Sequence, residues 1–172
     1  YADVGDILAA ARAKNEPPFI IIADGLNDPH NLGSIIRSAN AAGAHGVIIP
    51  KNRSVSLNSV VAKVSTGAVE YTPVARVTNI AQTIEKLKKE GLWICGTALE
   101  ASEDYFDADL TGALAIVIGS EGEGISRIVR ESCDFLVKIP MIGQTESLNA
   151  SVAAGILLYE SLRQRNAANK KG

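Results

Sequence analysis

Five mostly apolar runs divide the chain and predict its strands. They lie at residues 19–23, 46–50, 92–97, 113–118 and 135–139. A strand in a parallel sheet is covered by helices on both faces, so its residues are apolar at every position rather than at every second one. A sixth, weaker strand is predicted within residues 69–77, because Pro73 cannot donate to a ladder. The runs therefore predict a mostly parallel sheet.

The segments between these runs carry apolar residues at helical spacing. In residues 79–90 they fall on one side, with the lysines on the other. A helix over residues 31–42 has Asn31 as its N-cap and Gly43 as its stop. Further helices are predicted over residues 3–14, over 57–65 and up to about 131, and residues 100–109 are predicted to be a solvated acidic loop. The alternation predicts one α/β domain over residues 1–172, with helices on both faces of the sheet.

Residues 139–160 change character midway. Pro140 removes a backbone donor and Gly143 permits dihedrals closed to other residues, so the first half is irregular. The second half is predicted to be a helix with Ser147 as its N-cap. Its inward stripe is predicted to be Leu148, Val152, Ile156 and Tyr159. The basic residues from Arg163 onward are predicted to fray.

Composition fits a single globular domain. Of 172 residues, 47% are hydrophobic and 21% charged. No apolar run approaches the roughly 18 residues of a membrane span, and no signal-peptide pattern opens the chain. Cys95 and Cys133 lie in apolar contexts, which favours buried free thiols in a reducing compartment, and we expect a cytoplasmic protein. The net charge of −2 does not by itself indicate a nucleic-acid-binding protein.

Three loops of unusual composition follow predicted strands, at residues 24–37, 119–124 and 139–149. The carboxyl ends of parallel strands meet at one edge of the sheet, where α/β proteins bind ligands. We therefore expect the three loops to converge on one site.

Several common sites are excluded. A G-x-G-x-x-G motif that used Gly122 and Gly124 would need a third glycine where the chain has Arg127, and no Gly-Lys-Ser/Thr follows. The glycines of residues 119–124 indicate a tight turn instead. No group of His, Cys, Asp and Glu has metal-ligand spacing, so no metal is expected. The two histidines do not support a Ser-His-Asp set.

Arg37 lies in an otherwise apolar helix, where a guanidinium costs desolvation unless it meets an anion. Two partners remain open, an internal carboxylate such as Glu121 or a phosphate or ribose of a substrate. His30 is compatible with a general base, but a lone histidine in a loop is more often a polar surface residue.

Three segments, taken together, carry a family resemblance. They are Asn27-Asp-Pro-His-Asn-Leu-Gly-Ser-Ile-Ile-Arg-Ser-Ala39, Ile118-Gly-Ser-Glu-Gly-Glu-Gly-Ile125 and Ile139-Pro-Met-Ile-Gly-Gln-Thr-Glu-Ser-Leu-Asn-Ala-Ser-Val-Ala153. In composition and order they resemble the motifs of the SpoU (TrmH-type) RNA ribose 2′-O-methyltransferases of the SPOUT superfamily. The resemblance implies an α/β domain whose C-terminal segment forms a deep trefoil knot. It also implies S-adenosylmethionine as cofactor, RNA as substrate and a homodimer with the site at its interface.

The resemblance also assigns roles to residues. The backbones of Gly119, Ile139 and Leu148 match positions that hold the adenosine part of the cofactor, with Thr97 and Met141 lining the same pocket. Asn31, Arg37, Glu121, Ser147 and Asn149 match the polar residues of the catalytic centre. Because a guanidinium stays protonated, we expect Arg37 to bind a phosphate and stabilise the developing alkoxide rather than to act as base. Glu121 then orients Arg37 or Asn31, and the residues matching Ser147 and Asn149 position the ribose.

The branch that methylates a guanosine of 23S ribosomal RNA is the most similar, and its small N-terminal RNA-binding domain is expected to lie outside these residues. Transfer RNA is the rival substrate. A long basic C-terminal helix would favour it, and the short tail after Arg165 does not. A non-catalytic cofactor- or RNA-binding module is an alternative that the complete set of polar motif residues disfavours. Several basic side chains could either face RNA or be solvated, and for each we favour solvation. They are Lys51, Arg53, Lys63, Arg127 and Arg130.

Overall fold

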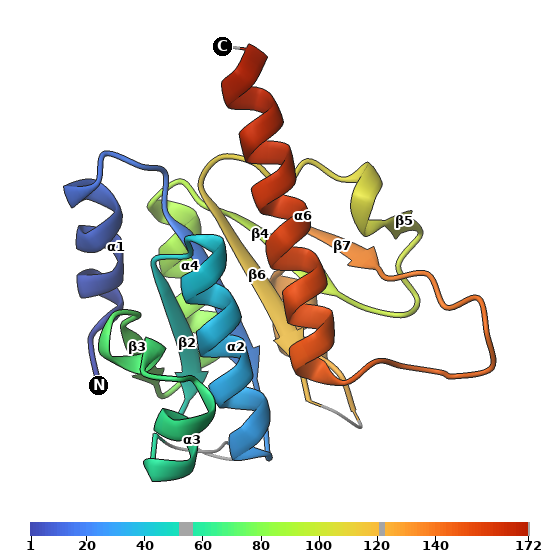
Figure 1. Cartoon of the computed structure of the whole chain (residues 1–172). Helices are drawn as coiled ribbons and strands as arrows, with labels where there is room; N and C mark the ends of the chain where they lie inside the picture. Colours follow the sequence, from blue (N-terminus) through green and yellow to red (C-terminus); the bar gives the residue numbers. More distant parts are fainter. Residues whose placement is uncertain (52–56, 121–122, 172) are drawn as a thin grey trace.

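The computed structural model describes residues 1–51, 57–120 and 123–171. Within them, seven strands form one sheet in the order β3-β2-β1-β6-β4-β7-β5, and every neighbouring pair is parallel (Figure 1). The strands are β1 (Phe19–Asp24), β2 (Gly46–Pro50), β3 (Val74–Val77), β4 (Trp93–Thr97), β5 (Glu103–Asp104), β6 (Leu114–Gly119) and β7 (Phe135–Lys138). The predicted parallel α/β architecture is confirmed. The five apolar runs form the five inner strands, and the strand after Pro73 lies at an edge.

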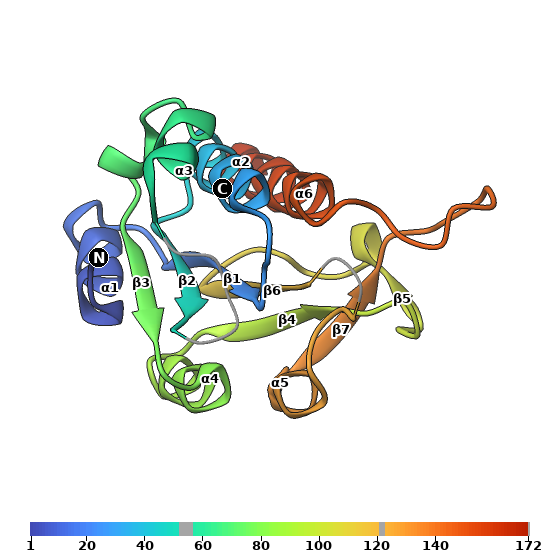
Figure 2. The ribbon, with the colours of Figure 1, turned by 90° about the horizontal axis from the view of Figure 1, so that it is seen from below.

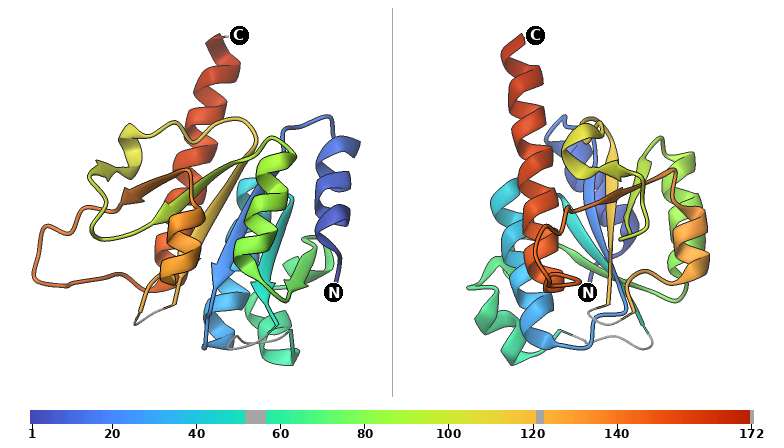
Figure 3. Two further views of the ribbon diagram at one scale, coloured as in Figure 1. Left: turned by 180° about the vertical axis from the view of Figure 1, so that it is seen from behind. Right: turned by 90° about the vertical axis from the view of Figure 1, so that its right-hand side faces the viewer.

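Helices cover both faces of this sheet (Figures 2 and 3). One face carries α2 (Pro29–Ala42), α3 (Ser59–Val64) and α6 (Ala150–Lys171), and the other carries α1 (Val4–Ala13), α4 (Ile80–Lys89) and α5 (Arg127–Ser132). Successive side chains of a strand point to opposite faces of the sheet, so they pack against the two helix layers in turn. In β1, Ile21 and Ala23 pack with α2 and α6, whereas Ile20 and Ile22 pack with α1 and α4. This two-sided packing explains why the strands are apolar at every position.

The N-terminus of α2 lies upstream of its predicted start. Pro29 occupies the first turn, where its fixed φ and missing N–H suit a helix. Asp28 is the cap, because its Oδ1 accepts the backbone N–H of His30 at 2.8 Å. The prediction of Asn31 as cap is therefore wrong, and Asn31 is buried in the helix. Gly43 ends the helix as predicted, with φ of 87°.

Residues 100–109 are more ordered than predicted. They contain β5, which pairs with β7, and the 3₁₀ helix η2 (Tyr105–Asp107). Ala101 and Ala108 are buried. Glu103 and Asp107 are exposed, but Asp104 is half-buried, so the expectation of a solvated loop, which rested on composition, is wrong. A second 3₁₀ helix, η1 (Ala68–Glu70), precedes β3.

The start and the buried face of α6 both differ from the prediction. Asn149, not Ser147, is the cap, because Asn149 Oδ1 accepts the backbone N–H groups of Ser151 at 2.9 Å and Val152 at 3.4 Å. The buried residues of the helix are Ala150, Ala154, Leu157, Leu158 and Ser161. They pack against α2 and the sheet, whereas Val152 and Tyr159 of the predicted inward stripe remain 49% and 48% exposed.

The C-terminal half of α6 is held by the segment that precedes β6. Ser161 Oγ donates to the carbonyl of Leu110 at 2.6 Å, and Gln164 Oε1 accepts the Leu110 N–H at 2.8 Å. Arg165 donates to the carbonyl of Gly112 at 2.7 Å, and its guanidinium lies 4.2 Å from the centre of the Phe19 ring. The helix continues to Lys171, and fraying of its end stays a prediction.

Candidate functional site

A cavity of about 290 Å³ opens at the carboxyl edge of the sheet. Its walls come from the ends of β4, β6 and β7, from the loops that follow these strands, and from the first turn of α6. The volume is close to the lower end for small-molecule sites, about 300 Å³. Two of the predicted loops, residues 119–124 and 139–149, thus meet here with the loop after β4. None of the described lining residues comes from the third, residues 24–37.

A tight turn forms one wall of this cavity. Ser120 and Gly124 exchange two backbone hydrogen bonds of 3.1 Å, and Gly124 has φ of +70°, which side-chain-bearing residues rarely adopt. Gly119, at the end of β6, packs so closely on the backbone of Gly124 and Ile125 that a Cβ would overlap it. The predicted tight turn is confirmed by these bonds between Ser120 and Gly124, and both residues line the cavity.

All five residues that the sequence suggested for the cofactor line this cavity, namely Thr97, Gly119, Ile139, Met141 and Leu148. Buried apolar side chains of Ile118, Ile125 and Val137 complete the wall. Thr97 Oγ1 donates to the carbonyl of Val117 at 3.0 Å, so this hydroxyl has only its acceptor lone pairs left for a ligand. The cavity therefore offers apolar walls, backbone groups and one oriented hydroxyl.

The residues suggested for the catalytic centre are more dispersed. Of them, Ser147 lines the cavity, while Asn149 caps α6 through its side-chain oxygen. The amide nitrogen of Asn149 is therefore its atom suited to a ligand. Asn31 is 5% exposed in the first turn of α2, and Arg37 lies further along that helix. The fifth residue, Glu121, lies outside the residues that the structure describes.

The side chain of Arg37 is exposed, so its guanidinium stays hydrated and the predicted desolvation does not occur. Within residues 1–51, 57–120 and 123–171, no ion pair includes its guanidinium. The alternative of a salt bridge to Glu121 involves a residue outside these ranges. An exposed guanidinium on α2 is positioned to meet an anion that comes from solvent.

The helices α2 and α6 lie side by side and run in the same direction (Figure 1). Both begin at the carboxyl edge of the sheet, so the positive ends of two helix dipoles point toward the same region.

Because residue 33 is a glycine, α3 packs closely against α2. A Cβ there would lie 2.8 Å from Val64 Cβ of α3, so this motif glycine serves helix packing.

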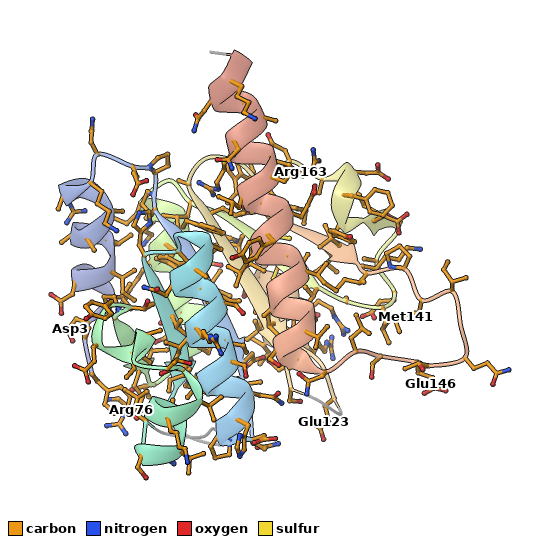
Figure 4. All side chains as sticks on the ribbon, viewed as in Figure 1. Asp3, Arg76, Glu123, Met141, Glu146 and Arg163 are labelled. Carbon is orange, nitrogen blue, oxygen red and sulfur yellow. The ribbon has the colours of Figure 1, made fainter. Side chains whose placement is uncertain are left out.

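Charged side chains form the rim of the cavity: Glu100, Glu123, Glu146, Arg130 and Lys138. Figure 4 shows Glu123 on the turn after β6, and Met141 and Glu146 on the extended segment that leads into α6. Arg130 of α5 pairs with Glu100 and stays partly exposed to solvent, so it is solvated as predicted but also has a partner within the fold. Arg130 and Glu100 are 30 residues apart in the sequence, so their pairing could not be predicted from it. The one hint that Glu100 lies near a ligand site is its position shortly after the end of a predicted strand.

Two further features bear on the chemistry. Burial raises the pKa of the Cys133 thiol to about 11 and raises that of Cys95 further, so both are neutral and unsuited to nucleophilic attack. Among the described residues, no three His, Cys, Asp or Glu side chains are grouped as metal ligands.

No helix in the described part of the chain has the length and apolar character needed to cross a bilayer.

Comparison with known proteins identifies the family. Residues 18–159 match the SpoU rRNA Methylase family. A relative named as a TrmH family tRNA/rRNA methyltransferase, YacO of Bacillus subtilis, is 58% identical over 166 residues, which are 96% of this chain and 67% of that protein. This chain thus spans about two thirds of the length of that relative.

A solved structure with a similar fold is that of the SpoU methyltransferase AviRb from Streptomyces viridochromogenes. It is 33% identical, has a TM-score of 0.87, and the match covers 98% of this chain and 66% of AviRb. A second structure of AviRb contains the cofactor AdoMet. It is 34% identical to this chain with a TM-score of 0.83, and the match covers 88% of this chain and 62% of AviRb. The chain described here therefore belongs to the SpoU family of S-adenosylmethionine-dependent RNA methyltransferases.

Proposed function

We propose that this chain transfers the methyl group of S-adenosylmethionine to a ribose 2′-hydroxyl of RNA, with a guanosine of 23S ribosomal RNA as the preferred substrate. One observation carries the proposal. Residues from two motifs that lie far apart in the sequence, among them Gly119, Ile139 and Leu148, line one cavity at the carboxyl edge of a parallel sheet. A cytoplasmic location is part of this proposal, because such a substrate is found there.

The cavity suits S-adenosylmethionine in its chemistry. Its apolar walls match the flat adenine ring, and Gly119, which lines the cavity without a side chain, leaves room for a ligand beside the backbone. Thr97 presents an oxygen that can accept from an amino group. We assign adenosine binding to Thr97, Gly119, Ile139, Met141 and Leu148. When bound there, the cofactor supplies an electrophilic sulfonium methyl group.

The chain's own polar residues would act on the RNA. A 2′-hydroxyl is a weak nucleophile until its proton is leaving. We propose that Arg37 binds the phosphate next to the reacting ribose and lowers the energy of the developing alkoxide. A phosphate oxygen or a water can then accept the proton, which a protonated guanidinium cannot.

The remaining motif residues would position this ribose. The helix that carries Asn31 and Arg37 packs beside α6, which begins with Asn149. We propose that Ser147 and the amide nitrogen of Asn149 hydrogen-bond the ribose. The two helix N-termini add a favourable field for a phosphate. Glu121 is proposed to orient Arg37 or Asn31.

A homodimer is part of this proposal, and α6 supports it. The helix has apolar residues on two faces, and among the described residues one of these faces is buried in the core. Val152 and Tyr159 lie on the other face and are half-exposed, and Ile142 in the preceding loop is 95% exposed. Apolar surface of this extent beside a site favours a partner, here a second copy. The C-terminal knot that the family implies stays a prediction for this chain.

Transfer RNA remains the rival substrate, and α6 gives it little support. The helix extends beyond the sheet as a basic segment (Figure 1). Arg163 is paired with Glu160, however, and Arg165 is held between Phe19 and Gly112. Two of its basic side chains are thus already engaged within the fold.

Calorimetry and a methyl-transfer assay test the proposal together. We expect binding of S-adenosylmethionine and transfer to 23S ribosomal RNA, with 2′-O-methylation at one guanosine that is missing in cells lacking the protein. Transfer to transfer RNA instead would select the rival substrate. Cofactor binding without transfer to either RNA would support the non-catalytic module, and no cofactor binding would reject the assignment of the cavity.

A further inference from the structure

The ion pair between Arg130 and Glu100 lies on the rim of the cavity, outside the three sequence motifs. Arg130 Nη1 donates to Glu100 Oε1 at 2.5 Å, across the mouth from α5 to the loop after β4. Both side chains are partly accessible to solvent. An accessible pair of this kind adds about 0–1 kcal/mol to stability. Fold stability therefore does not account for placing two opposite charges at this mouth.

We infer that this pair binds the amino-acid end of the cofactor, an inference that rests on the proposed function. That end is a zwitterion, with one carboxylate and one ammonium group. The planar fork of Arg130 matches a carboxylate, and Glu100 accepts from an ammonium group. Entry of the zwitterion exchanges one ion pair for two. The apolar walls that Ile118, Ile125 and Val137 form remain for adenosine.

The charges of the whole rim favour a ligand with a net positive charge, such as S-adenosylmethionine, over an RNA phosphate. Three carboxylates, Glu100, Glu123 and Glu146, face two cations, Arg130 and Lys138, among the described lining residues. An excess of negative charge repels a polyanion at short range. S-adenosylmethionine carries a sulfonium, an ammonium and a carboxylate, so its net charge is complementary to this rim.

Arg130 is a better carboxylate ligand than Lys138. Its guanidinium is held by Glu100, and the helix α5 fixes the position of its backbone. Lys138 has no ion pair with another described residue and presents a single charge on a flexible stem. We therefore expect the loss of Arg130 to affect binding more than the loss of Lys138.

Two ligands that differ only by the amino-acid end test the inference by calorimetry. S-adenosylhomocysteine carries this end, and 5′-methylthioadenosine lacks it. Arg130→Met keeps the apolar stem and removes the charge, and we expect it to weaken S-adenosylhomocysteine about 10- to 100-fold, as for a lost charged hydrogen bond. The affinity for methylthioadenosine should stay within about twofold. Glu100→Gln should reproduce this selectivity, and Lys138→Met should show a smaller effect.

Arg127→Met is the matched control. Arg127 lies on the same helix and pairs with Glu131 at 3.0 Å, but it does not line the cavity. It should leave both affinities unchanged. The inference is overturned if Arg130→Met weakens the two ligands equally or weakens neither, or if Lys138→Met has the larger effect. If the unmodified protein binds neither ligand, the proposed function fails as well, and the two failures are thereby distinguished.

Discussion

At the scale of single residues, Gly119 and Gly143 belong to neighbouring loops but differ in the space around them. A Cβ on Gly119 would overlap the backbone of Gly124 and Ile125, whereas a Cβ on Gly143 would meet nothing within 4 Å. Neither of these two glycines has a positive φ. The sequence shows both as glycines in loops, and only the packing around them tells them apart.

Gly119→Ala should therefore damage the cavity while Gly143→Ala should not. Overpacking against backbone costs about 1–3 kcal/mol, and the turn at Gly124 must move to relieve it. We expect a lower melting temperature and at least a roughly tenfold loss of S-adenosylmethionine affinity. Gly143→Ala should change stability by no more than about 0.5 kcal/mol. Equal behaviour of the two variants in calorimetry and thermal unfolding would contradict the packing argument.

Arg37→Ala should separate catalysis from cofactor binding. Arg37 is exposed on α2 and does not line the cavity, so cofactor affinity should be nearly unchanged. The loss of a charged contact in the transition state typically lowers the rate by about two to three orders of magnitude. Single-turnover methyl transfer and calorimetry measure the two effects. Near-normal turnover would remove Arg37 from the mechanism, and partial activity of Arg37→Lys would favour the electrostatic role.

At the scale of elements, α6 links the site to the rest of the fold. Its first residues follow the cavity loop, and its C-terminal half is tied to the segment before β6 by Ser161, Gln164 and Arg165. The cap at Asn149 therefore has a structural role besides its proposed contact with ribose.

Substitutions of Asn149 can separate these roles. Asn149→Ala removes the cap and should lower the free energy of unfolding by about 1 kcal/mol. Asn149→Asp keeps an acceptor oxygen at the cap and should preserve stability, but it lacks the amide donors. If the amide nitrogen holds the ribose, Asn149→Asp should lose methyl transfer at unchanged melting temperature. Full activity of Asn149→Asp would restrict the residue to capping.

At the scale of the whole molecule, three of the ten large apolar side chains that are exposed among the described residues lie on α6 and the loop before it. Ile142, Val152 and Tyr159 are all exposed to a large extent, close in sequence to the cavity loop. Another exposed apolar residue, Tyr71, follows η1 near β3, at the opposite edge of the sheet from β7. The two positions therefore allow a test of which surface forms a dimer.

Tyr159→Glu should shift the protein from dimer to monomer, because a buried unpaired carboxylate is costly at an apolar interface. Tyr71→Glu should leave the dimer intact. Sedimentation velocity at several concentrations measures both. A protein that is monomeric before substitution, or a dimer that tolerates Tyr159→Glu, would contradict the proposed interface.

The sequence by itself determined six of the seven strands and the six α-helices of the described residues, and the edge of the sheet at which the cavity opens. Apolar runs identify strands buried on two faces because helices cover both sides, and parallel strands bring their following loops to one edge. The tertiary structure alone decided which loops share a cavity, that Arg130 meets Glu100, and which face of α6 is buried. Hydrophobic periodicity is a local property, so it shows which positions avoid water without showing what covers them. The strand order β3-β2-β1-β6-β4-β7-β5 arises from long-range pairing, and this order places β4, β6 and β7 around the cavity.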